Sequence, residues 1–407
     1  MNNEPYNAVG IDVSKGKSTI AVMRPFGEVV VSPFETSHSS SDLKALTQVL
    51  RELDGDTRII MEYTGKYYQP IARALYDAGF YVSVIHSKLI HDFANNSIRK
   101  VKTDKADAVK IANYGLANWQ NLIPYSTEDE TRLLLKTCNR QYNQYMKQYV
   151  AAKNNLLSIL DQVFPGLNSL FNCNRRPNGH TKWIDAANRF WHCEYVCSFS
   201  ENRFVEIYNE WCKKNDYKRS DVKAKELYHY AKECVATLPK NANTKRIVQN
   251  AVNYTQTISD MLVATHDEMI SLASQLPEYP VVMSLNGVGE ILGPQLMAEI
   301  GDVRRFPKRS NLVAYAGIDA PPFQSGQYNA KSRHISKRGP GDLRKTLFQI
   351  VSVLLKLGME EDSVYNFLCK KRAEGKPYYV CMVAASNKFL RIYYARVNEY
   401  LNRIEVN

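Results

Sequence analysis

The sequence lacks the features of a membrane protein or an exported protein. No stretch approaches the roughly 20 consecutive apolar residues that a helix needs to cross a bilayer. The first residues, MNNEPYNAVG, have neither the basic start nor the apolar stretch of a secretory signal peptide. We therefore expect a cytoplasmic protein that has no membrane partner.

Paired cysteine modules of the Cys-x-x-Cys type are also missing. The 8 cysteines are scattered through a long sequence, which predicts free thiols rather than a disulfide framework. One local group leaves a zinc site open as a weakly supported alternative. Its members are His192, Cys193 and Cys197, with Cys173 and Cys212 on either side.

Acidic residues are outnumbered by basic ones. The chain has 41 Asp and Glu against 53 Lys and Arg, which gives a net charge of +12 and a pI of about 9.1. This balance favours polyanion partners, and without an evident amphipathic anchor we favour nucleic acid over an anionic membrane. Solubility alone is the other interpretation. With 407 residues, 44% of them hydrophobic, we expect two or three domains with substantial cores.

Residues 1–125 have the pattern of an α/β domain. Apolar runs predict strands at 7–13, 18–24, 27–34, 57–62 and 80–85. Helices are predicted after Asp42 and at 67–78, 87–95 and 104–118. Three strands followed by alternating helices and strands match the order of the ribonuclease-H-like fold, which places an acid on its first strand and another on its fourth.

Four acidic residues in this region are the strongest candidates for catalysis. Asp12 and Glu62 each end an apolar strand, and Asp104 and Asp107 lie three residues apart, on one face of a predicted helix. Together they could hold hard divalent cations through oxygen, and a pair of such metals is a common device for phosphodiester chemistry. The group therefore suggests an enzyme that cuts or joins nucleic acid.

Each of these acids alone has a simpler explanation. An aspartate after a strand is usually a turn residue or a helix cap, and an i, i+3 pair is usually a solvated helix face. The combination of two strand-end acids with the Asp104–Asp107 pair is what favours a metal site over those explanations.

Residues 126–278 have the pattern of a long helical region. Apolar and tyrosine residues recur at alternating steps of three and four, which predicts a coiled coil or a long bundle helix. These are Leu135, Cys138, Tyr142, Tyr145, Tyr149, Ala152, Leu156, Ile159 and Val163. A looser second seam is predicted at Ile247, Ala251, Tyr254, Ile258, Met261 and Leu272. The two helices could pair antiparallel within one chain or serve in dimerisation.

Between the two seams, at about 165–240, lies a segment rich in aromatic, cysteine and basic residues. It contains Trp183, Trp191 and Trp211 and looks helical from Lys223 to Leu238. Its composition would suit contact with RNA or DNA. We favour the simpler interpretation, a small helical insert that packs its own tryptophans.

Residues 279–407 begin with a glycine turn and continue as a basic domain. The turn at Gly287 and Gly289 precedes a predicted helix and resembles the hairpin of helix-hairpin-helix modules, although a plain turn is equally consistent. Residues 301–345 contain ten basic residues and only three aspartates, so this region is the best candidate for phosphate contact. The basic residues are Arg304, Arg305, Lys308, Arg309, Lys331, Arg333, Lys337, Arg338, Arg344 and Lys345.

The order of several short motifs resembles a known family. GIDVSK, MEYTG, KTDKADA, SLNGVG, AYAGI, QSG and SKRG occur in the order found in the DEDD transposases of the insertion-sequence family often called one-ten/eleven-eleven, which are related to the Piv DNA invertases. The resemblance covers about 1–125 and 279–360, roughly half of the chain. The middle insert is longer and more aromatic than the family leads us to expect.

The resemblance implies a fold and a chemistry. It implies a RuvC-like N-terminal domain and a C-terminal transposase domain, which we expect to be mainly α and to follow the coiled-coil middle region predicted from the heptad pattern. Asp12, Glu62, Asp104 and Asp107 would bind magnesium, or alternatively manganese, and Ser325 would be a serine nucleophile. The enzyme would be a bacterial recombinase that forms a phosphoserine link to DNA.

The resemblance also implies partners. A bridge RNA would guide the enzyme by pairing with both donor and target DNA, and the protein would act as a dimer or tetramer associated with the nucleoid during transposition. We expect the first domain and the aromatic insert to bind this RNA, with a steep dependence on salt.

Two other functions remain consistent with the sequence. A metal-only RuvC-like nuclease of branched DNA would need the four acids but not Ser325. A nucleic-acid-binding protein with an inactive site would need neither, although the presence of all four acids argues against decay of the site.

Overall fold

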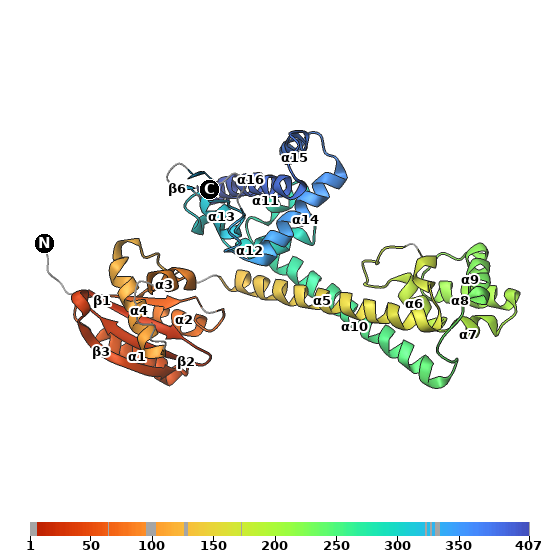
Figure 1. Ribbon diagram of the computed structural model, residues 1–407, viewed down its shortest axis with the longest axis horizontal. Helices are drawn as coiled ribbons and strands as arrows, with labels where there is room; N and C mark the ends of the chain where they lie inside the picture. The colour runs from red at the N-terminus through yellow and green to blue at the C-terminus, as the bar shows by residue number, and fades with distance from the viewer. Residues whose placement is uncertain are drawn as a thin grey trace. The chain divides into compact units, whose positions relative to one another are not determined.

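The computed structural model describes residues 6–63, 65–94, 103–125, 129–171, 173–321, 324–325, 328–329 and 334–406 (Figure 1). The chain divides into two compact units, Met1–Thr127 and Glu128–Asn407. In the described part of the chain, no helix is both long enough and apolar enough to cross a membrane. We describe each unit by itself.

The first unit is built on a five-stranded mixed sheet. Its strands are β1 (Tyr6–Val13), β2 (Lys17–Met23), β3 (Val29–Ser37), β4 (Asp56–Glu62) and β5 (Tyr81–Ile85), in the spatial order β3-β2-β1-β4-β5. β1, β2 and β3 are antiparallel neighbours, whereas β4 and β5 run parallel to β1. This arrangement confirms the ribonuclease-H-like order predicted from the sequence. Pro33 lies in β3, at an edge of the sheet, where a missing N–H is tolerated.

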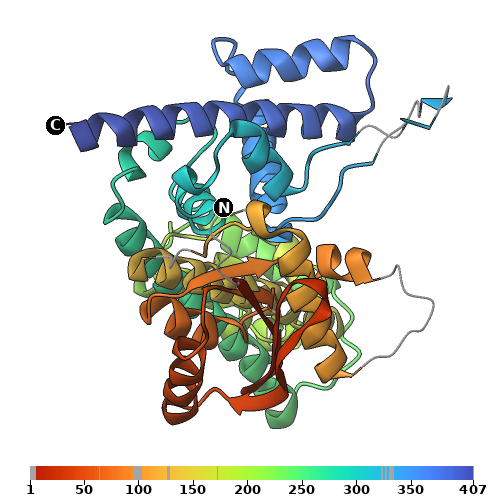
Figure 2. The ribbon, with the colours of Figure 1, turned by 90° about the vertical axis from the view of Figure 1, so that its left-hand side faces the viewer.

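Helices cover both faces of this sheet (Figure 2). Alternate residues of β1 point to opposite faces: Val9 and Ile11 belong to the core beneath α1 (Ser40–Arg51) and α2 (Gln69–Asp77), while Ala8 packs beneath α3 (Ser87–Ala94) and α4 (Asp104–Ala117). Ser39 caps α1 by accepting a hydrogen bond from the backbone N–H of Asp42.

The second unit is mainly helical. Its first half contains α5 (Glu130–Val163), α6 (Lys182–Arg189), α7 (Cys193–Cys197), α8 (Glu201–Lys214), α9 (Asp221–Glu233) and α10 (Ala242–Ser274). Its second half contains α11 (Tyr279–Met283), α12 (Leu292–Ile300), α13 (Arg309–Ala316), β6 (Gln324–Ser325), β7 (Tyr328–Asn329), α14 (Gly341–Leu357), α15 (Ser363–Ala373) and α16 (Tyr378–Val406).

The two longest helices of the first half, α5 and α10, pack antiparallel. The end of α5 shares one core with the start of α10, at Leu156 and Val252, and the start of α5 shares another with the end of α10, at Leu135 and Leu272. The antiparallel pairing predicted within one chain is therefore present. The contacts establish a helix pair, and the expected coiled coil is not confirmed.

The second predicted seam is wrong for half of its residues. Ile247, Tyr254 and Met261 expose 49, 55 and 43% of their surface, whereas Val248, Thr255 and Leu262, one residue further along, are buried. A shift of one residue on a helix turns the side chain by about 100°, so the chosen residues face solvent instead of α5.

The insert between α5 and α10 packs its own aromatic residues, as we favoured. Trp183, Trp191 and Trp211 are each less than a tenth exposed and belong to one core with the facing ends of α5 and α10. All eight cysteines of the chain lie in described segments and carry free thiols, as predicted. The insert's aromatic content is therefore explained by its core.

Candidate active site and nucleic-acid contacts

The sheet brings the two strand-end acids to one edge. β1 and β4 are parallel neighbours with Ile11 opposite Met61, so Asp12 and Glu62, each the next residue, leave the same end of adjacent strands. Both side chains are partly exposed, unlike the apolar residues that precede them. Strand register alone therefore accounts for the proximity of these two carboxylates.

Helix α4 lies directly against the sheet because small residues line the contact. A Cβ atom on Gly10 would lie 2.1 Å from the carbonyl oxygen of Ala108 and 2.4 Å from the backbone nitrogen of Ala112. One turn further, a Cβ on Gly115 would lie 2.4 Å from Ile60. Glycine at these positions permits the close approach that brings α4 to Asp12.

Asp104 and Asp107 occupy the first turn of α4. Thr103 caps the helix by accepting a hydrogen bond from the backbone N–H of Ala106 at 3.2 Å. Acidic side chains at a helix N-terminus interact favourably with the helix dipole. Asp104 is exposed and Asp107 is half-buried, with its carboxylate 2.7 Å from the ammonium of Lys110.

The electrostatics of Asp12 show that the other three acids lie close enough to affect its ionisation. Partial burial, together with the negative charges of Asp104, Asp107 and Glu62, raises the pKa of Asp12 to about 6. Each cause disfavours the ionised form, and a nearby cation would reverse that effect. Clustered carboxylates with one raised pKa are a feature of functional sites.

The donor set suits a hard divalent cation, but its side chains are not gathered around one point. Carboxylate oxygens are the ligands that Mg²⁺ and Mn²⁺ prefer. Among the residues that the structure describes, no three His, Cys, Asp or Glu side chains converge closely enough to hold a metal ion. Neither the four acids nor the cysteine-rich group around His192 forms such a group. The four acids therefore have suitable ligand chemistry and lie near one another, but they do not form a preassembled metal site.

Ser325 lies on a short hairpin in the second unit. Its backbone forms β6, with Ser325 opposite Tyr328 of β7, and its side chain is outside the described residues. The ends of the segment that carries this hairpin are joined: the backbone N–H of Ser336 donates to the carbonyl of Asp319 at 2.9 Å, and the Ser336 hydroxyl donates to the Asp319 carboxylate. We call this pair the hairpin clasp.

A tight crossing of backbone supports the hairpin clasp. A Cβ on Gly339 would lie 1.5 Å from the carbonyl oxygen of Tyr315, so only glycine fits there. The Arg344 guanidinium donates to the carbonyls of Ala316 and Gly339, at 3.2 and 2.8 Å. One terminal nitrogen of Arg344, a residue that we expect to contact phosphate, therefore also braces this backbone.

The remaining basic residues fall into three groups. Arg304 is paired with Asp302 at 2.7 Å, Arg305 lies over the rings of Phe306 and Tyr315, and Lys345 donates to Asn143. Another group is exposed and forms no ion pair with any residue the structure describes: Lys308, Arg309, Lys337 and Arg338. Lys331 and Arg333 lie outside the described residues.

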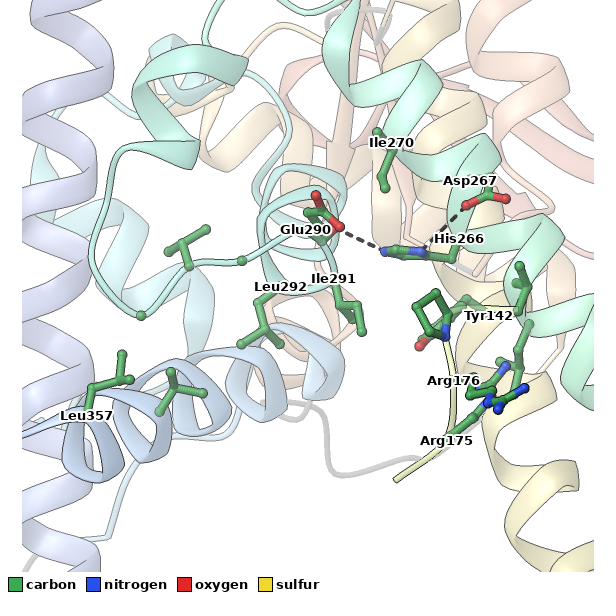
Figure 3. Close-up of a pocket in the computed structure, with 17 residues that line it drawn as sticks. Tyr142, Arg175, Arg176, His266, Asp267, Ile270, Glu290, Ile291, Leu292 and Leu357 are labelled. Carbon is green, nitrogen blue, oxygen red and sulfur yellow. Dashed lines mark hydrogen bonds and ion pairs between the residues drawn. The ribbon is translucent and has the colours of Figure 1, made fainter. Parts of the chain in front are cut away.

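The glycine turn at 287–289 lines a groove of about 900 Å³ between α10, α12 and α14 (Figure 3). Gly287 has a φ of +77°, and a Cβ there would lie 2.8 Å from Leu354, so packing accounts for this glycine. Gly289 has open space around it. His266, between Asp267 and the carbonyl of Glu290, is the polar centre of the groove, which carries charges of both signs.

Sequence reasoning missed three residues that support the candidate site. Lys110 could have been found, because it lies three residues after Asp107 on the same helix. Asp319 and Ser336 are 17 residues apart, and no local pattern indicates that they pair. Only the fold of the α13–α14 connection reveals the hairpin clasp.

Two family models match this chain. The first, DEDD_Tnp_IS110, described as a transposase, matches residues 9–165, and the second, described as the transposase IS116/IS110/IS902 family, matches residues 279–365. Together they cover the four acids, Ser325 and the hairpin clasp.

Curated relatives are similar over most of the chain. The 43.6 kDa protein of insertion element IS110 from Streptomyces coelicolor is 20% identical over 96% of this chain and 94% of its own length. The pilin gene-inverting protein of Moraxella lacunata is 23% identical over 84% of this chain and 80% of its own. A solved T. thermophilus RuvC in complex with a Holliday junction substrate matches 29% of this chain and 99% of its own, with 14% identity and a TM-score of 0.21.

Proposed function

The chain belongs to the IS110 family of DEDD transposases, and we propose that it exchanges DNA strands through a serine-linked intermediate at a carboxylate-bound metal site. One observation carries the proposal. Asp12 is surrounded by the charges of Asp104, Asp107 and Glu62 at the edge of a ribonuclease-H-like sheet. Four carboxylates close enough to influence one ionisation, with a single lysine, Lys110, paired to one of them, suit a site that receives Mg²⁺ and a phosphodiester.

The acids of the first unit would bind the metal and fix its position. When bound, Mg²⁺ would withdraw charge from the scissile phosphate and favour attack on it. Asp12 must lose its proton to serve as a ligand, and its raised pKa makes that step dependent on pH. Lys110, paired with Asp107, fixes the direction of one carboxylate.

The serine step is a balanced exchange of phosphate esters. The Ser325 oxygen forms a bond to phosphorus and gives up its proton, while the bond from phosphorus to one sugar oxygen breaks and that oxygen leaves as a hydroxyl. Attack by another sugar hydroxyl reverses the exchange, releases the serine and joins new ends without ATP. The exposed Lys337 and Arg338, next to the hairpin clasp, would offset the negative charge.

Guidance by RNA is part of the same proposal. Base pairing between a bridge RNA and both donor and target DNA would supply sequence specificity, and the protein would bind mainly backbone. The net charge of +12 and the exposed cations at 308, 309, 337 and 338 support binding of this kind. Action as a dimer or tetramer associated with the nucleoid completes the proposal.

A trapping assay tests the chemistry. The protein, purified with any copurifying RNA, is incubated with a nicked donor duplex and Mg²⁺, and a covalent protein–DNA adduct is sought on a denaturing gel. Peptide mass spectrometry then maps the link. We expect an adduct on Ser325 that disappears in Ser325→Ala, in Asp104→Ala and in EDTA.

A metal-only nuclease is the second candidate. It is favoured by the location of all four acids in a unit with its own core, while Ser325 belongs to the other unit. In that case DNA is cleaved in Mg²⁺ without an adduct, and Ser325→Ala is as active as the unchanged protein. Loss of all cleavage in Asp104→Ala with intact DNA binding separates both enzymes from an inactive binding protein.

A further inference from the structure

The connection between α15 and α16 has an unusual surface. From Lys370 to Tyr379 the chain reads KKRAEGKPYY, and every residue from Arg372 to Tyr379 is exposed. We call this segment the basic–aromatic turn. It lies beyond residue 365, where the second family match ends, and it contains none of the proposed catalytic residues.

Positive charge dominates the basic–aromatic turn. The turn contains a single carboxylate, that of Glu374, and four cations, at 370, 371, 372 and 376. Glu374 pairs with Lys371 at 2.7 Å, and this hydrogen bond, together with the charges of Lys370 and Lys376, lowers the pKa of Glu374. The side chains of Lys370, Arg372 and Lys376 form no ion pair with any described residue, so their charge remains available to a partner.

Two tyrosines stand beside these cations. Tyr378 and Tyr379 open α16 with 49 and 77% of their surfaces exposed. Their ring centroids are 5.5 Å apart and the ring planes are at 74°, so the two rings present faces in different directions. Neither ring belongs to one of the hydrophobic cores of the unit, so internal packing does not account for them.

The backbone of the turn is well fixed by hydrogen bonds. The N–H groups of Glu374, Gly375 and Lys376 donate to the carbonyls of Lys370, Arg372 and Lys371 and close the end of α15. The buried thiol of Cys381 donates to the carbonyl of Lys376 at 3.4 Å. The cations and rings are thus carried on an ordered turn, which reduces the entropy lost on binding.

We propose that the basic–aromatic turn binds an unpaired segment of nucleic acid. Cations spaced along a short turn match successive phosphates, and exposed tyrosine rings are stacking surfaces for bases whose faces are free. In a duplex the base faces are covered by stacking, so the rings favour a single strand over a duplex. An anionic membrane or an acidic peptide would use the cations but would leave two tyrosine faces without a matching group.

The test measures binding by the full-length protein to a fluorescein-labelled oligo(dT) of 20 nucleotides, by anisotropy over a range of salt concentrations. We expect Tyr379→Ala to weaken binding about tenfold through lost stacking, and Tyr379→Phe to bind normally. The triple variant Lys370→Gln/Arg372→Gln/Lys376→Gln should reduce the slope of log affinity against log salt by about 2, at about 0.7 per lost phosphate contact.

A matched control separates this surface from general charge. Lys356→Gln/Arg391→Gln/Arg396→Gln removes the same number of exposed cations from parts of α14 and α16 to which we assign no nucleic-acid binding, and should leave the slope nearly unchanged. With 5-iodouracil in the oligonucleotide, ultraviolet light should cross-link the strand to the peptide that contains Tyr378 and Tyr379. Circular dichroism melting curves confirm that the variants are folded.

Three results would overturn the proposal. One is an equal reduction of the salt slope in the control variant and in the triple variant of the turn. Another is normal affinity of Tyr378→Ala/Tyr379→Ala for the oligonucleotide, with no cross-link to the turn. The third is a loss confined to duplex DNA or to phosphatidylserine vesicles. Binding is measured without catalysis, so failure of Ser325 to form an adduct would leave this result standing.

Discussion

Asp319 and Ser336 join the two ends of the segment that carries Ser325. One backbone and one side-chain hydrogen bond connect them across 17 residues, and Arg344 and Gly339 hold the adjoining backbone. The hairpin that carries Ser325 therefore leaves the helical core from a fixed base.

The hairpin clasp should affect strand transfer without affecting DNA binding. Ser336→Ala removes the hydroxyl donor to a carboxylate, a bond worth about 1.5–3 kcal/mol, and we expect the yield of the Ser325 adduct to fall about tenfold at unchanged DNA affinity. Ser336→Thr, which keeps the hydroxyl, should restore most of the yield. Ser310→Ala, an exposed serine on α13, serves as the control. An equal loss of affinity and yield would mean that the clasp is merely structural.

Asp12 should make the stability of the first unit depend on pH. Its folded pKa of about 6 lies above its ordinary value of 3.8, so the ionised carboxylate destabilises the fold above pH 6 and has no effect once both states are protonated. In EDTA at pH 8, Asp12→Asn should raise the free energy of unfolding by about 1 kcal/mol, a figure reduced because the group is partly solvated.

Urea unfolding at pH 8 and pH 4 measures the Asp12 effect. The gain should fall to a small fraction at pH 4, which is close to the ordinary pKa of 3.8, and Asp77→Asn, on the exposed face of α2, should show no such gain at either pH. A gain that is independent of pH would contradict the assigned pKa.

Gly10 should be essential for the approach of α4 to the sheet. A methyl group there would meet the backbone of α4 at 2.1 Å, which a rotamer change cannot relieve. Gly10→Ala should cost about 1–3 kcal/mol of stability and weaken Mg²⁺ binding, which calorimetry can measure. Gly289→Ala, with no heavy atom within 4 Å, should be nearly neutral. A Gly10→Ala protein of normal stability would show that α4 packs differently.

A buried ion pair should anchor the start of α5 to the second half of the unit. Arg132 and Glu278 form two hydrogen bonds, and their side chains are 5 and 1% exposed. Arg132→Met leaves a buried carboxylate and should cost about 3–5 kcal/mol in thermal or urea unfolding. Arg132→Met/Glu278→Met should recover much of that loss. If the double variant is no more stable than the single one, the pair contributes more than charge balance.

Much of the first unit could be predicted from the sequence. Apolar alternation located all five strands, although β3 extends to Ser37, beyond the predicted end, because Pro33 interrupts the pattern. The two strand-end acids follow from the order of the strands. The close contact of α4 does not, because it depends on Gly10 meeting Ala108, a pairing that sequence spacing cannot indicate.

Prediction was poorer in the second unit for physical reasons. On α10, Ile247 and Val248 are both apolar and adjacent, so the sequence alone does not decide which of them faces α5. Likewise, the sequence does not indicate that one terminal nitrogen of Arg344 donates to two backbone carbonyls. Both outcomes depend on neighbours that are distant in the sequence.

Because α5 and α10 contribute to both cores of the second unit, the two cores become complete at different points during synthesis. The core of the insert needs only residues 156–252, whereas the core that contains Leu135 also includes Leu401. As the ribosome adds residues from the N-terminus, the insert can fold while the first turns of α5 still wait for their partners. All residues of the insert's core are therefore available for folding before the hairpin with Ser325 has been translated.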